Sequence, residues 1–314
     1  MKEYIGVDIG GTKCAVVRAD ENGSVIEKEK FPTTNVKETL ANIIAAANKL
    51  KTAKTAHIGV SCGSPLDAER GVILSPPNLP GWDEINIVKI LEDAVGVPTT
   101  LCNDANACAL AEWIYGAGRG TKNMIFLTFG TGMGAGLILD GRLYSGTNGM
   151  AGEVGHIRMA KSGPVGYGKV GSFEGFCSGG GVGRLGRAEA EKALRRGITP
   201  LYCQSFDKLD TVTAKSVAEA ADAGDETAIK VYKKSGEMLG RGLAILVDVF
   251  NPEMIVIGSV FARSEKLLRA SMEKTLQKEA IDISLAKCRV VPAALGDLIG
   301  DVAAVSVARN ADTK

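Results

Sequence analysis

VPTTLCNDANACALAEW, residues 97–113, joins a predicted strand to a predicted helix. The apolar, β-branched run after Pro98 is typical of a short strand, and the alanine-rich segment from Ala105 to Glu112 predicts a helix capped by Asn103 and Asp104. Ligands gather at the carboxyl ends of strands in open α/β sheets, which makes the Asp104 carboxylate a candidate catalytic group. A carboxylate at this point can also serve only as a helix cap, and this stretch alone leaves both interpretations open.

A glycine turn near the N-terminus links two further predicted strands, Tyr4 to Asp8 and Cys14 to Arg18. Such a hairpin differs from the strand-to-helix turn of Rossmann and Walker loops. Backbone N–H groups of the turn can approach a phosphate closely, and Asp8 can hold Mg²⁺ directly or through water. A plain hairpin turn without a ligand is the alternative. The turn residues are Gly10, Gly11, Thr12 and Lys13.

The same arrangement occurs again after GAGRGTKN at 116–123, a glycine-rich break that indicates a domain boundary. An apolar strand from Met124 to Phe129 enters a second turn, and another apolar strand runs from Ala135 to Leu139. Two such hairpins, one in each domain, are expected to clamp a triphosphate from both sides. The second turn contains Gly130, Thr131, Gly132 and Gly134.

Two loops offer candidate sugar contacts. The predicted strand from His57 to Ser61 ends in a small-residue loop that contains Ser64. The rigid loop SPPNLPGW at 75–82 presents Asn78 and Trp82 as side chains able to contact a ligand. A simple turn explains the first loop, and packing explains the second, about equally well.

A third polar segment runs from Ser145 to Glu174, where abundant glycine and missing periodicity predict an ordered loop that lines a cleft. Carboxylates and an imidazole can accept hydrogen bonds from, or donate them to, several hydroxyls of a sugar. A flexible, solvated loop is the alternative. The polar side chains are Asn148, Glu153, His156 and Glu174.

Composition excludes several classes of protein. The chain has 314 residues with 45% hydrophobic content, which allows a substantial core in two domains or lobes. Its 37 basic and 36 acidic residues give a net charge of +1, which argues against a nucleic-acid or anionic-membrane partner. The sequence has no signal-peptide pattern and no apolar run long enough to span a membrane, so we expect a cytoplasmic protein. Its seven cysteines are scattered, which favours reduced thiols over disulfides.

Taken in order, the motifs resemble those of the ROK family of bacterial sugar kinases, within the actin/hexokinase-like ATPase superfamily. The resemblance covers nearly the whole chain and rests on VDIGGTK at 7–13, PPNLPGW at 76–82, NDANACALAEW at 103–113, TFGTGMGAGLILDGRLYSGTNGMAGEVGH at 128–156, GSFE at 171–174 and NPEMIVIGS at 251–259. It implies a two-lobed α/β fold of the actin/hexokinase-like (ribonuclease H-like) type with a central cleft. The lobes would be residues 1–116 plus 298–314 and residues 117–297.

The resemblance also implies a role for each candidate residue. ATP and Mg²⁺ are the implied cofactors, with the two phosphate turns on 8–13 and 130–134 and the adenosine contact on Gly258 and Ser259. The catalytic aspartate falls on Asp104. The sugar ligands fall on Asn78, Asn103, Glu153, His156 and Glu174, beside the Ser64 loop.

The chain departs from the family pattern in two places. Most members bind zinc through the histidine of EVGH and three nearby cysteines, where this chain has Val165, Tyr167 and Ser172. None of these offers a thiolate, so we expect no zinc site and a loop held by packing of Tyr167 and Phe173. The usual G-x-P-G-P sugar loop reads SCGSP at 61–65, which leaves the sugar open.

The expected reaction is ATP-dependent phosphorylation of a hexose hydroxyl, foremost the 6-hydroxyl of glucose or a related aldohexose, with Asp104 as the base. A kinase for fructose, allose, N-acetylmannosamine or N-acetylglucosamine is an alternative, as is a sugar-binding regulator without activity. Family habit suggests a homodimer, and the sequence does not decide whether polyphosphate replaces ATP. The family's repressors carry an added N-terminal DNA-binding domain, for which the residues before Asp8 leave no room.

Overall fold

The computed structural model describes residues 1–313 and shows a mixed α/β fold, which confirms the predicted class. Contacts divide the chain into two compact units. Unit 1 contains Met1–Lys122, Gly136–Ala151 and the residues from Ala294 onward, and unit 2 contains Asn123–Ala135 and Gly152–Ala293. The lobe boundaries suggested by the sequence stay a prediction. None of the helices within residues 1–313 has the length and apolarity that crossing a bilayer requires.

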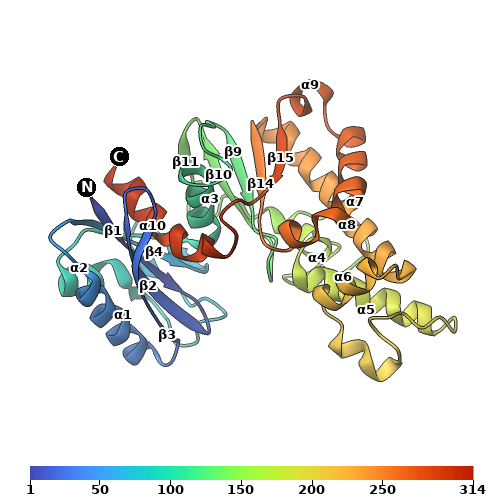
Figure 1. Cartoon of the computed structure of the whole chain (residues 1–314), viewed down its shortest axis with the longest axis horizontal. Coiled ribbons are helices and arrows are strands. Elements are labelled where there is room, and N and C mark those ends of the chain that lie inside the picture. Colours follow the sequence, from blue (N-terminus) through green and yellow to red (C-terminus); the bar gives the residue numbers. More distant parts are fainter. Residues whose placement is uncertain (314) are drawn as a thin grey trace. The chain divides into compact units, whose positions relative to one another are not determined.

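A five-stranded sheet forms the centre of unit 1 (Figure 1). Its strand order is β3 (Val25–Pro32), β2 (Lys13–Asp20), β1 (Glu3–Ile9), β4 (Thr55–Cys62) and β8 (Thr99–Asn103). The first three strands are antiparallel neighbours, whereas β1, β4 and β8 run parallel. Ile9 pairs with Cys62, and Cys62 pairs with Asn103, so the carboxyl ends of the three parallel strands are in register at one edge of the sheet.

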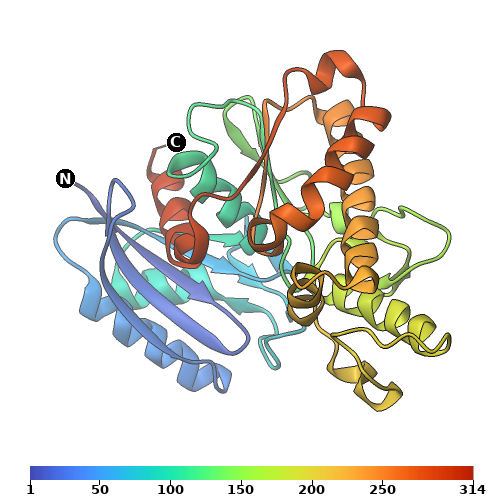
Figure 2. The same cartoon turned by 45° about the vertical axis from the view of Figure 1, so that its right-hand side comes forward.

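Helices cover both faces of this sheet. Ile5, Val7 and Ile9 alternate along β1 and join one core with α1 (Val36–Leu50) and α2 (Ile87–Val95). Tyr4, on the opposite face, packs with residues of α10 (Ile299–Asp312), which contacts α3 (Asp104–Ile114) (Figure 2). Because side chains alternate along a strand, Asp8 lies on the α10 face as well.

A glycine in β4 lets α10 approach this sheet closely. A Cβ on Gly59 would lie 2.1 Å from the carbonyl oxygen of Ala304 and 2.5 Å from the backbone nitrogen of Ala308. Any larger residue would push the helix away from the strand, so the tight packing of α10 depends on this position.

The remaining strands of unit 1 are short. A small antiparallel sheet has the order β5-β6-β7, and β10 pairs with β11 in a hairpin whose first residue belongs to unit 2. These strands are β5 (Leu66–Asp67), β6 (Val72–Ile73), β7 (Ile85–Asn86), β10 (Ala135–Leu139) and β11 (Arg142–Tyr144).

Unit 2 combines three parallel strands with a group of helices. β9 (Met124–Leu127) and β15 (Arg289–Pro292) pair with the two sides of β14 (Met254–Ile257). The two longest helices pack against each other. The helices are α4 (Phe173–Phe176), α5 (Gly179–Leu194), α6 (Ala214–Asp222), α7 (Glu226–Phe250), α8 (Val260–Glu279) and α9 (Asp282–Leu285), with the 3₁₀ helices η1 (Val154–His156) and η2 (Phe206–Thr211); a third, η3 (Gly296–Leu298), belongs to unit 1.

The segment predicted as a loop up to Glu174 contains η1, α4 and a small hairpin of β12 (Val165–Gly166) and β13 (Lys169–Val170). Phe173 is fully buried against Gly242 of α7, which confirms its predicted packing. Tyr167, the other residue predicted to hold the loop by packing, is 79% exposed and belongs to no core. Its ring instead meets the His156 ring edge-on, with 6.2 Å between centroids.

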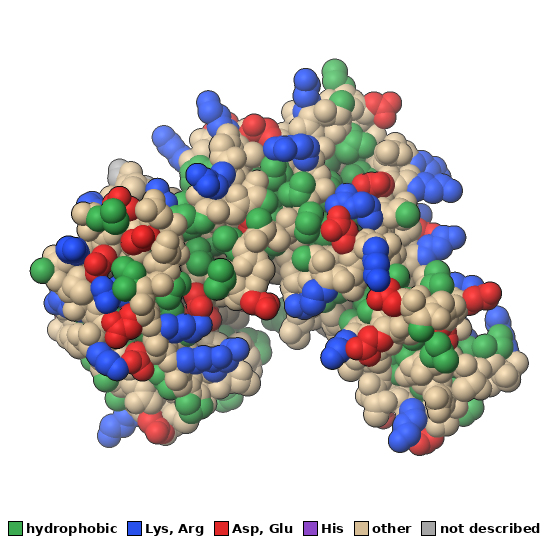
Figure 3. All heavy atoms as spheres, viewed as in Figure 1, with side chains coloured by type: hydrophobic (Ala, Val, Ile, Leu, Met, Phe, Trp, Pro, Cys, Tyr) green, Lys and Arg blue, Asp and Glu red, His purple; other side chains and the backbone are tan. Residues whose placement is uncertain are grey.

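All seven cysteines are free thiols, as the scattered spacing predicts. Basic and acidic side chains are interspersed over the face drawn in Figure 3, with no large area of one sign, which matches the balanced composition.

Candidate active site

Asp104 is the first residue of α3 and follows β8 directly. The helix cap is Asn103, whose side-chain oxygen accepts a hydrogen bond from the Asn106 nitrogen at 2.7 Å. The interpretation of Asp104 as the helix cap is therefore wrong, because the N-cap position is occupied by Asn103 and Asp104 is the first residue of the helix. Asp104 is exposed to solvent, and within residues 1–313 its carboxylate joins no ion pair and accepts one hydrogen bond, from the Ala105 nitrogen at 2.8 Å.

Protein atoms nevertheless crowd this carboxylate. Burial raises the pKa of Asp104 above its ordinary value, against the opposing effect of the backbone N–H groups of Ala105 and of Asp104 itself. An exposed carboxylate with a raised pKa is suited to accept a proton from a substrate near neutral pH.

Asp8 lies near the end of β1, on the same sheet edge. Its Oδ2 atom faces α10 and lies 3.8 Å from where a Cβ on Gly300 would stand. Burial, the charge of Asp104 and the charge of Asp301 raise the pKa of Asp8 to about 6. Lys28 pairs with Asp301 at 2.6 Å and partly offsets the negative charge. Mg²⁺ prefers carboxylate oxygens, and Asp8 offers one such carboxylate. Within residues 1–313 no three acidic, histidine or cysteine side chains gather as ligands of one ion.

The first glycine turn is closed by a hydrogen bond from the Gly10 nitrogen to the Lys13 carbonyl oxygen at 3.1 Å. Gly11 lies against the backbone of Asn78, since an added Cβ would come within 2.4 Å of the Asn78 carbonyl oxygen. The amide oxygen of Asn78 in turn lies 3.6 Å from where a Cβ on Gly63 would stand, next to Ser64. The structure thus brings the first turn, which includes Thr12, together with the two predicted sugar loops of unit 1.

Trp82 does not contribute to this site. Its side chain is 1% exposed and belongs, with Leu79, to the core under α1 and α2. The prediction of Trp82 as a ligand contact is therefore wrong: its indole anchors the loop, and Asn78 is left exposed at the loop's surface.

The second glycine turn lies in unit 2, between β9 and β10. The Thr128 nitrogen donates to the Gly134 carbonyl oxygen at 3.0 Å, and the Gly134 nitrogen donates to Thr128 Oγ1 at 2.8 Å. Within the turn, the Gly130 nitrogen donates to the Gly132 carbonyl oxygen at 3.1 Å. The Gly130 carbonyl oxygen accepts from the Gly179 nitrogen at 2.7 Å, which places the N-terminus of α5 beside the turn.

A cavity of about 620 Å³ opens at this turn. Gly130 and Thr131 line it together with Ser259, which follows β14, so the structure joins the predicted second phosphate turn to the predicted adenosine contact. Gly258, just before, is bonded through its nitrogen to the Leu127 carbonyl oxygen at 3.0 Å.

Other residues that line this cavity were not predicted from the sequence. They include Gly179 and Gly180 at the start of α5, Lys215 and Glu219 of α6, and Arg263 of α8. The run SGGG at 178–181 was a usable signal, because a glycine-rich helix N-terminus presents free N–H groups to phosphates. No local pattern identifies the residues of α6 and α8, since only the fold brings them to the cavity.

The three predicted sugar ligands of unit 2 lie near one another in the chain's fold. Glu153 directly precedes η1 and His156 is its last residue, and both side chains are exposed. Glu174 accepts a hydrogen bond from the Met133 nitrogen at 3.1 Å, and a Cβ on Gly132 would lie 2.8 Å from its Oε2. Glu174 therefore sits against the second glycine turn. The predicted residues thus form two groups, one in each unit.

Comparisons with known proteins give a consistent result. The model of the ROK family matches residues 4–311. A glucokinase from Halalkalibacterium halodurans is 32% identical over 88% of this chain and 86% of its own length. An N-acetylmannosamine kinase from Citrobacter koseri is 32% identical over 88% of this chain and 90% of its own. The crystal structure of a ROK family glucokinase from Streptomyces griseus, in complex with glucose and AMPPNP, has a TM-score of 0.77 at 30% identity and covers 98% of this chain and 99% of its own.

Proposed function

Because the chain belongs to the ROK family, we propose that this ATP-dependent hexose kinase phosphorylates the 6-hydroxyl of glucose or a closely related aldohexose. Its α/β fold is of the actin/hexokinase-like type. The observation that carries the proposal is Asp104, an exposed carboxylate with a raised pKa and no ion pair within residues 1–313, at the carboxyl edge of a parallel sheet.

Asp104 orients the sugar hydroxyl and accepts its proton as the hydroxyl attacks the γ-phosphate. General-base catalysis of this kind contributes roughly 10²- to 10⁴-fold to a rate. Asn103, Asn78 and Ser64 bind other hydroxyls of the sugar from the same unit, and Glu153, His156 and Glu174 do so from unit 2. A sugar offers little apolar surface, so its recognition depends on such polar groups.

The nucleotide is assigned to the glycine turns and to the cavity of unit 2. Backbone N–H groups at 10–13 and 130–134 bind phosphates, with Thr12, Lys13 and Thr131 as further donors, and Ser259 contacts the adenosine. Asp8 would hold Mg²⁺, directly or through water, and the ion would neutralise phosphate charge.

The second candidate is an N-acetylmannosamine kinase. The relative from Citrobacter koseri with that activity is as similar to this chain as the glucokinase is, at 32% identity. The phosphate chemistry would be the same, and only the sugar loops would differ.

We also propose that the protein acts in the cytoplasm as a homodimer, without a nucleic-acid partner and without zinc. The absence of thiolates at Val165, Tyr167 and Ser172 supports the last point. Elemental analysis of the purified protein tests it.

A panel of sugars in a coupled ADP-release assay tests the main proposal. We expect the highest kcat/KM with glucose, followed by related aldohexoses, and little activity with fructose, allose, N-acetylglucosamine or N-acetylmannosamine. A clear preference for N-acetylmannosamine would select the second candidate. No ADP release with any sugar would leave only a sugar-binding regulator.

Asp104→Ala tests the base. We expect the variant to bind sugar normally in calorimetry and to lose roughly 10²-fold or more in kcat. Asp93→Asn, which changes an exposed acid on α2, is the control and should keep wild-type kcat. If Asp104→Ala kept more than about a tenth of the wild-type kcat, Asp104 would not be the base.

A further inference from the structure

Tyr167 stands at the tip of the small hairpin of β12 and β13 in unit 2. The register pairs Gly166 with Lys169, so Tyr167 and Gly168 form a two-residue turn. Both turn residues have positive φ angles, 41° and 75°. Turns of this kind favour Asn-Gly or Gly-Gly, because a bulky side chain crowds the backbone in the left-handed region. A tyrosine is therefore an unfavourable first residue for this turn.

Burial does not account for this tyrosine, because its side chain is 79% exposed. Its ring instead contacts the ring of His156 edge-on, with 6.2 Å between the centroids and 75° between the ring planes. Aromatic rings in this arrangement attract each other beyond the effect of the area that they bury. A strained and exposed residue points to a functional role. The ring contact identifies His156 as the group through which Tyr167 acts.

The base of the hairpin is fixed against its neighbours in unit 2. Gly166 packs on α4, since a Cβ added to it would lie 3.0 Å from the Cβ of Glu174. On the other strand, the Arg158 guanidinium donates to the Val170 carbonyl oxygen at 2.7 Å. Arg158 follows η1 closely, so the turn that carries Tyr167 is held in place relative to both η1 and α4.

The same hairpin also holds the backbone of His156. Lys169 Nζ donates to the His156 carbonyl oxygen at 2.8 Å, and the His156 nitrogen donates to the Glu153 carbonyl oxygen at 3.2 Å. Neither bond restricts the rotation of the imidazole about its side-chain torsions. The contact with the ring of Tyr167 does restrict it, so the hairpin fixes the backbone of His156 through one residue and its side chain through another.

We propose that Tyr167 is a positioning residue of the sugar site, whose ring holds the His156 imidazole in the orientation that binds a sugar hydroxyl. The proposal rests on the proposed function, in which His156 is a sugar ligand. An exposed imidazole without this contact populates several rotamers, and only one of them meets the hydroxyl. Selecting that rotamer before the sugar arrives lowers the entropy cost of binding. Tyr167 acts through His156 and does not itself contact the sugar.

Tyr167→Asn tests the proposal on the full chain, because it removes the ring and supplies the residue that the turn favours. We expect a melting temperature equal to or above that of the wild type, so unfolding cannot explain a change in binding. The probe is the sugar with the highest kcat/KM in the panel. Its KM, and its Kd in calorimetry, should rise roughly two- to tenfold, which is the range for one aromatic pair. The kcat and the KM for ATP should stay within about twofold of the wild type, because the ring contact serves sugar binding alone.

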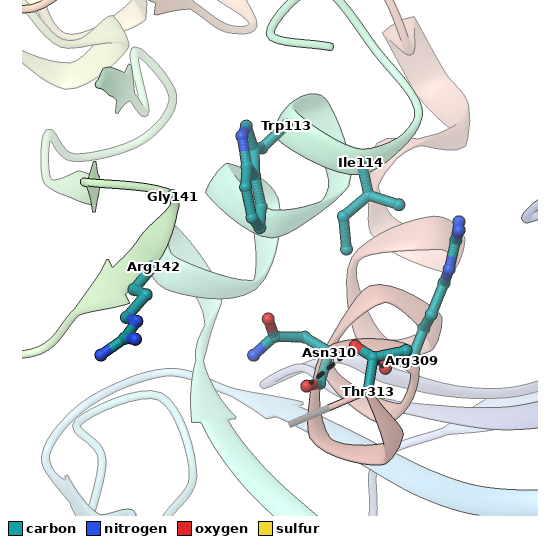
Figure 4. A pocket seen from close by; sticks show the side chains of 7 residues that line it. All are labelled: Trp113, Ile114, Gly141, Arg142, Arg309, Asn310 and Thr313. Atoms are coloured by element: carbon teal, nitrogen blue, oxygen red, sulfur yellow. Dashed lines mark hydrogen bonds between the residues drawn. The ribbon is translucent and has the colours of Figure 1, made fainter. Parts of the chain in front are cut away.

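Two further variants serve as controls. Tyr167→Phe should bind the sugar as the wild type does, because the edge-on contact needs the ring and not the hydroxyl. Tyr144→Asn removes another exposed tyrosine and should leave the Kd unchanged. Tyr144 is 50% exposed and lies on β11 in unit 1, the strand whose Arg142 lines a separate cavity of about 770 Å³ at the ends of α3 and α10 (Figure 4).

A double-mutant cycle separates positioning from direct contact with the sugar. In a chain that carries His156→Ala, Tyr167→Asn should not raise the Kd further, because the group that Tyr167 positions is missing. A further rise in this background would overturn the proposal and show that Tyr167 contacts the sugar itself. An unchanged Kd for the single variant Tyr167→Asn would overturn it as well. A lower melting temperature, with kcat and both KM values changed together, would show a merely structural role and overturn it too.

Failure of the proposed function gives a different result. A wild type that phosphorylates a sugar, together with a Tyr167→Asn variant of unchanged Kd, would overturn only the role of Tyr167. A wild type that binds a sugar in calorimetry but releases no ADP would overturn the kinase, and the comparison of Kd values would still decide the role of Tyr167. A wild type that neither binds nor phosphorylates any sugar of the panel would overturn both.

Discussion

Asp104 should give the kinase a characteristic acidic limb in its pH profile. Its raised pKa means that the carboxylate takes up a proton at a higher pH than an ordinary aspartate does. A protonated carboxyl cannot act as the base, so kcat/KM should fall as pH drops through this raised value. Steady-state kinetics between about pH 4.5 and 8 measure this fall in kcat/KM.

A kcat/KM that stays constant down to the pH range in which an ordinary aspartate titrates would contradict the assignment of Asp104 as the base. Asp93→Asn should reproduce the wild-type profile, because its side chain is exposed on α2, away from the strand ends.

The ionised carboxylate of Asp8 should lower the free energy of unfolding at neutral pH. Its pKa of about 6 in the folded chain lies above the ordinary value of 3.8. A group with a raised folded-state pKa stabilises the fold fully below its unfolded-state pKa, and this contribution is lost as pH rises through about 6. Asp8→Asn should therefore be more stable than the wild type above that pH, by at most about 3 kcal/mol, while it loses activity.

Urea unfolding in EDTA at a series of pH values measures this difference. The two proteins should converge below about pH 3, where Asp8 is protonated in both the folded and unfolded states. A variant that is less stable than the wild type at neutral pH, or a gain that does not change with pH, would contradict the electrostatic explanation.

Single residues could be predicted where local chemistry was sufficient. The polar pair Asn103 and Asp104 marks a helix start in any context, although only the structure shows which of the two is the cap. The contact of Gly11 with Asn78 joins loops that are 67 residues apart in the numbering, and no local pattern contains it. Trp82 was misjudged because a loop tryptophan looks the same in sequence whether it faces a ligand or the core.

At the scale of elements, Glu112 ties the end of α3 to the segment that leads into α10. This fully buried carboxylate accepts hydrogen bonds from the nitrogens of Ala117 at 2.8 Å, Leu295 at 2.9 Å and Ala294 at 3.2 Å. Glu112→Ala leaves these donors without their acceptor and opens a cavity. We expect a loss of about 3 kcal/mol or more in the free energy of unfolding, measured by urea denaturation.

Glu92→Ala is the matched control, because Glu92 is exposed and accepts one bond, from the Thr99 nitrogen at 3.0 Å. Glu92→Ala should lower the free energy of unfolding by about 1 kcal/mol. Equal effects of the two substitutions would show that Glu112 does not act as a junction between elements.

Most long elements were predictable because periodicity and caps agree. The predicted helix at 105–112 lies within α3, and the predicted strand at 135–139 matches β10. α2 was missed although Asn86 caps it and Gly96 ends it in a left-handed conformation, so a signal was present. The two-residue strands and α4 were not predictable, since tertiary contacts define such short elements.

At the scale of the whole molecule, α10 is required to complete unit 1. Tyr4, Val17 and Ala19 of the sheet pack against Val305 and Ala308. A chain ending at residue 298 would expose this apolar surface. We expect it to be recovered without a cooperative melting transition, by circular dichroism and size-exclusion chromatography. A chain ending at Ala311 loses, among the described residues, the contacts of Asp312 and Thr313, and it should still melt cooperatively.

A soluble, cooperatively folded chain of 298 residues would contradict this role for α10. The sequence alone could not supply the packing of α10 on β1 and β4, because a pattern of small apolar residues does not say which surface it covers. The resemblance to a known family predicted only that residues 298–314 belong with the first lobe. The close contact of α10 with Gly59 of β4 comes from the structure.

The late position of α10 also has a consequence for biosynthesis. A ribosome has released β1, β2 and β4 into the cell long before it adds the helix that covers one of their faces. The nascent chain must carry that face uncovered until the residues of α10 emerge. A chaperone that shields apolar strands would have its natural target there, between the emergence of β4 and the emergence of α10.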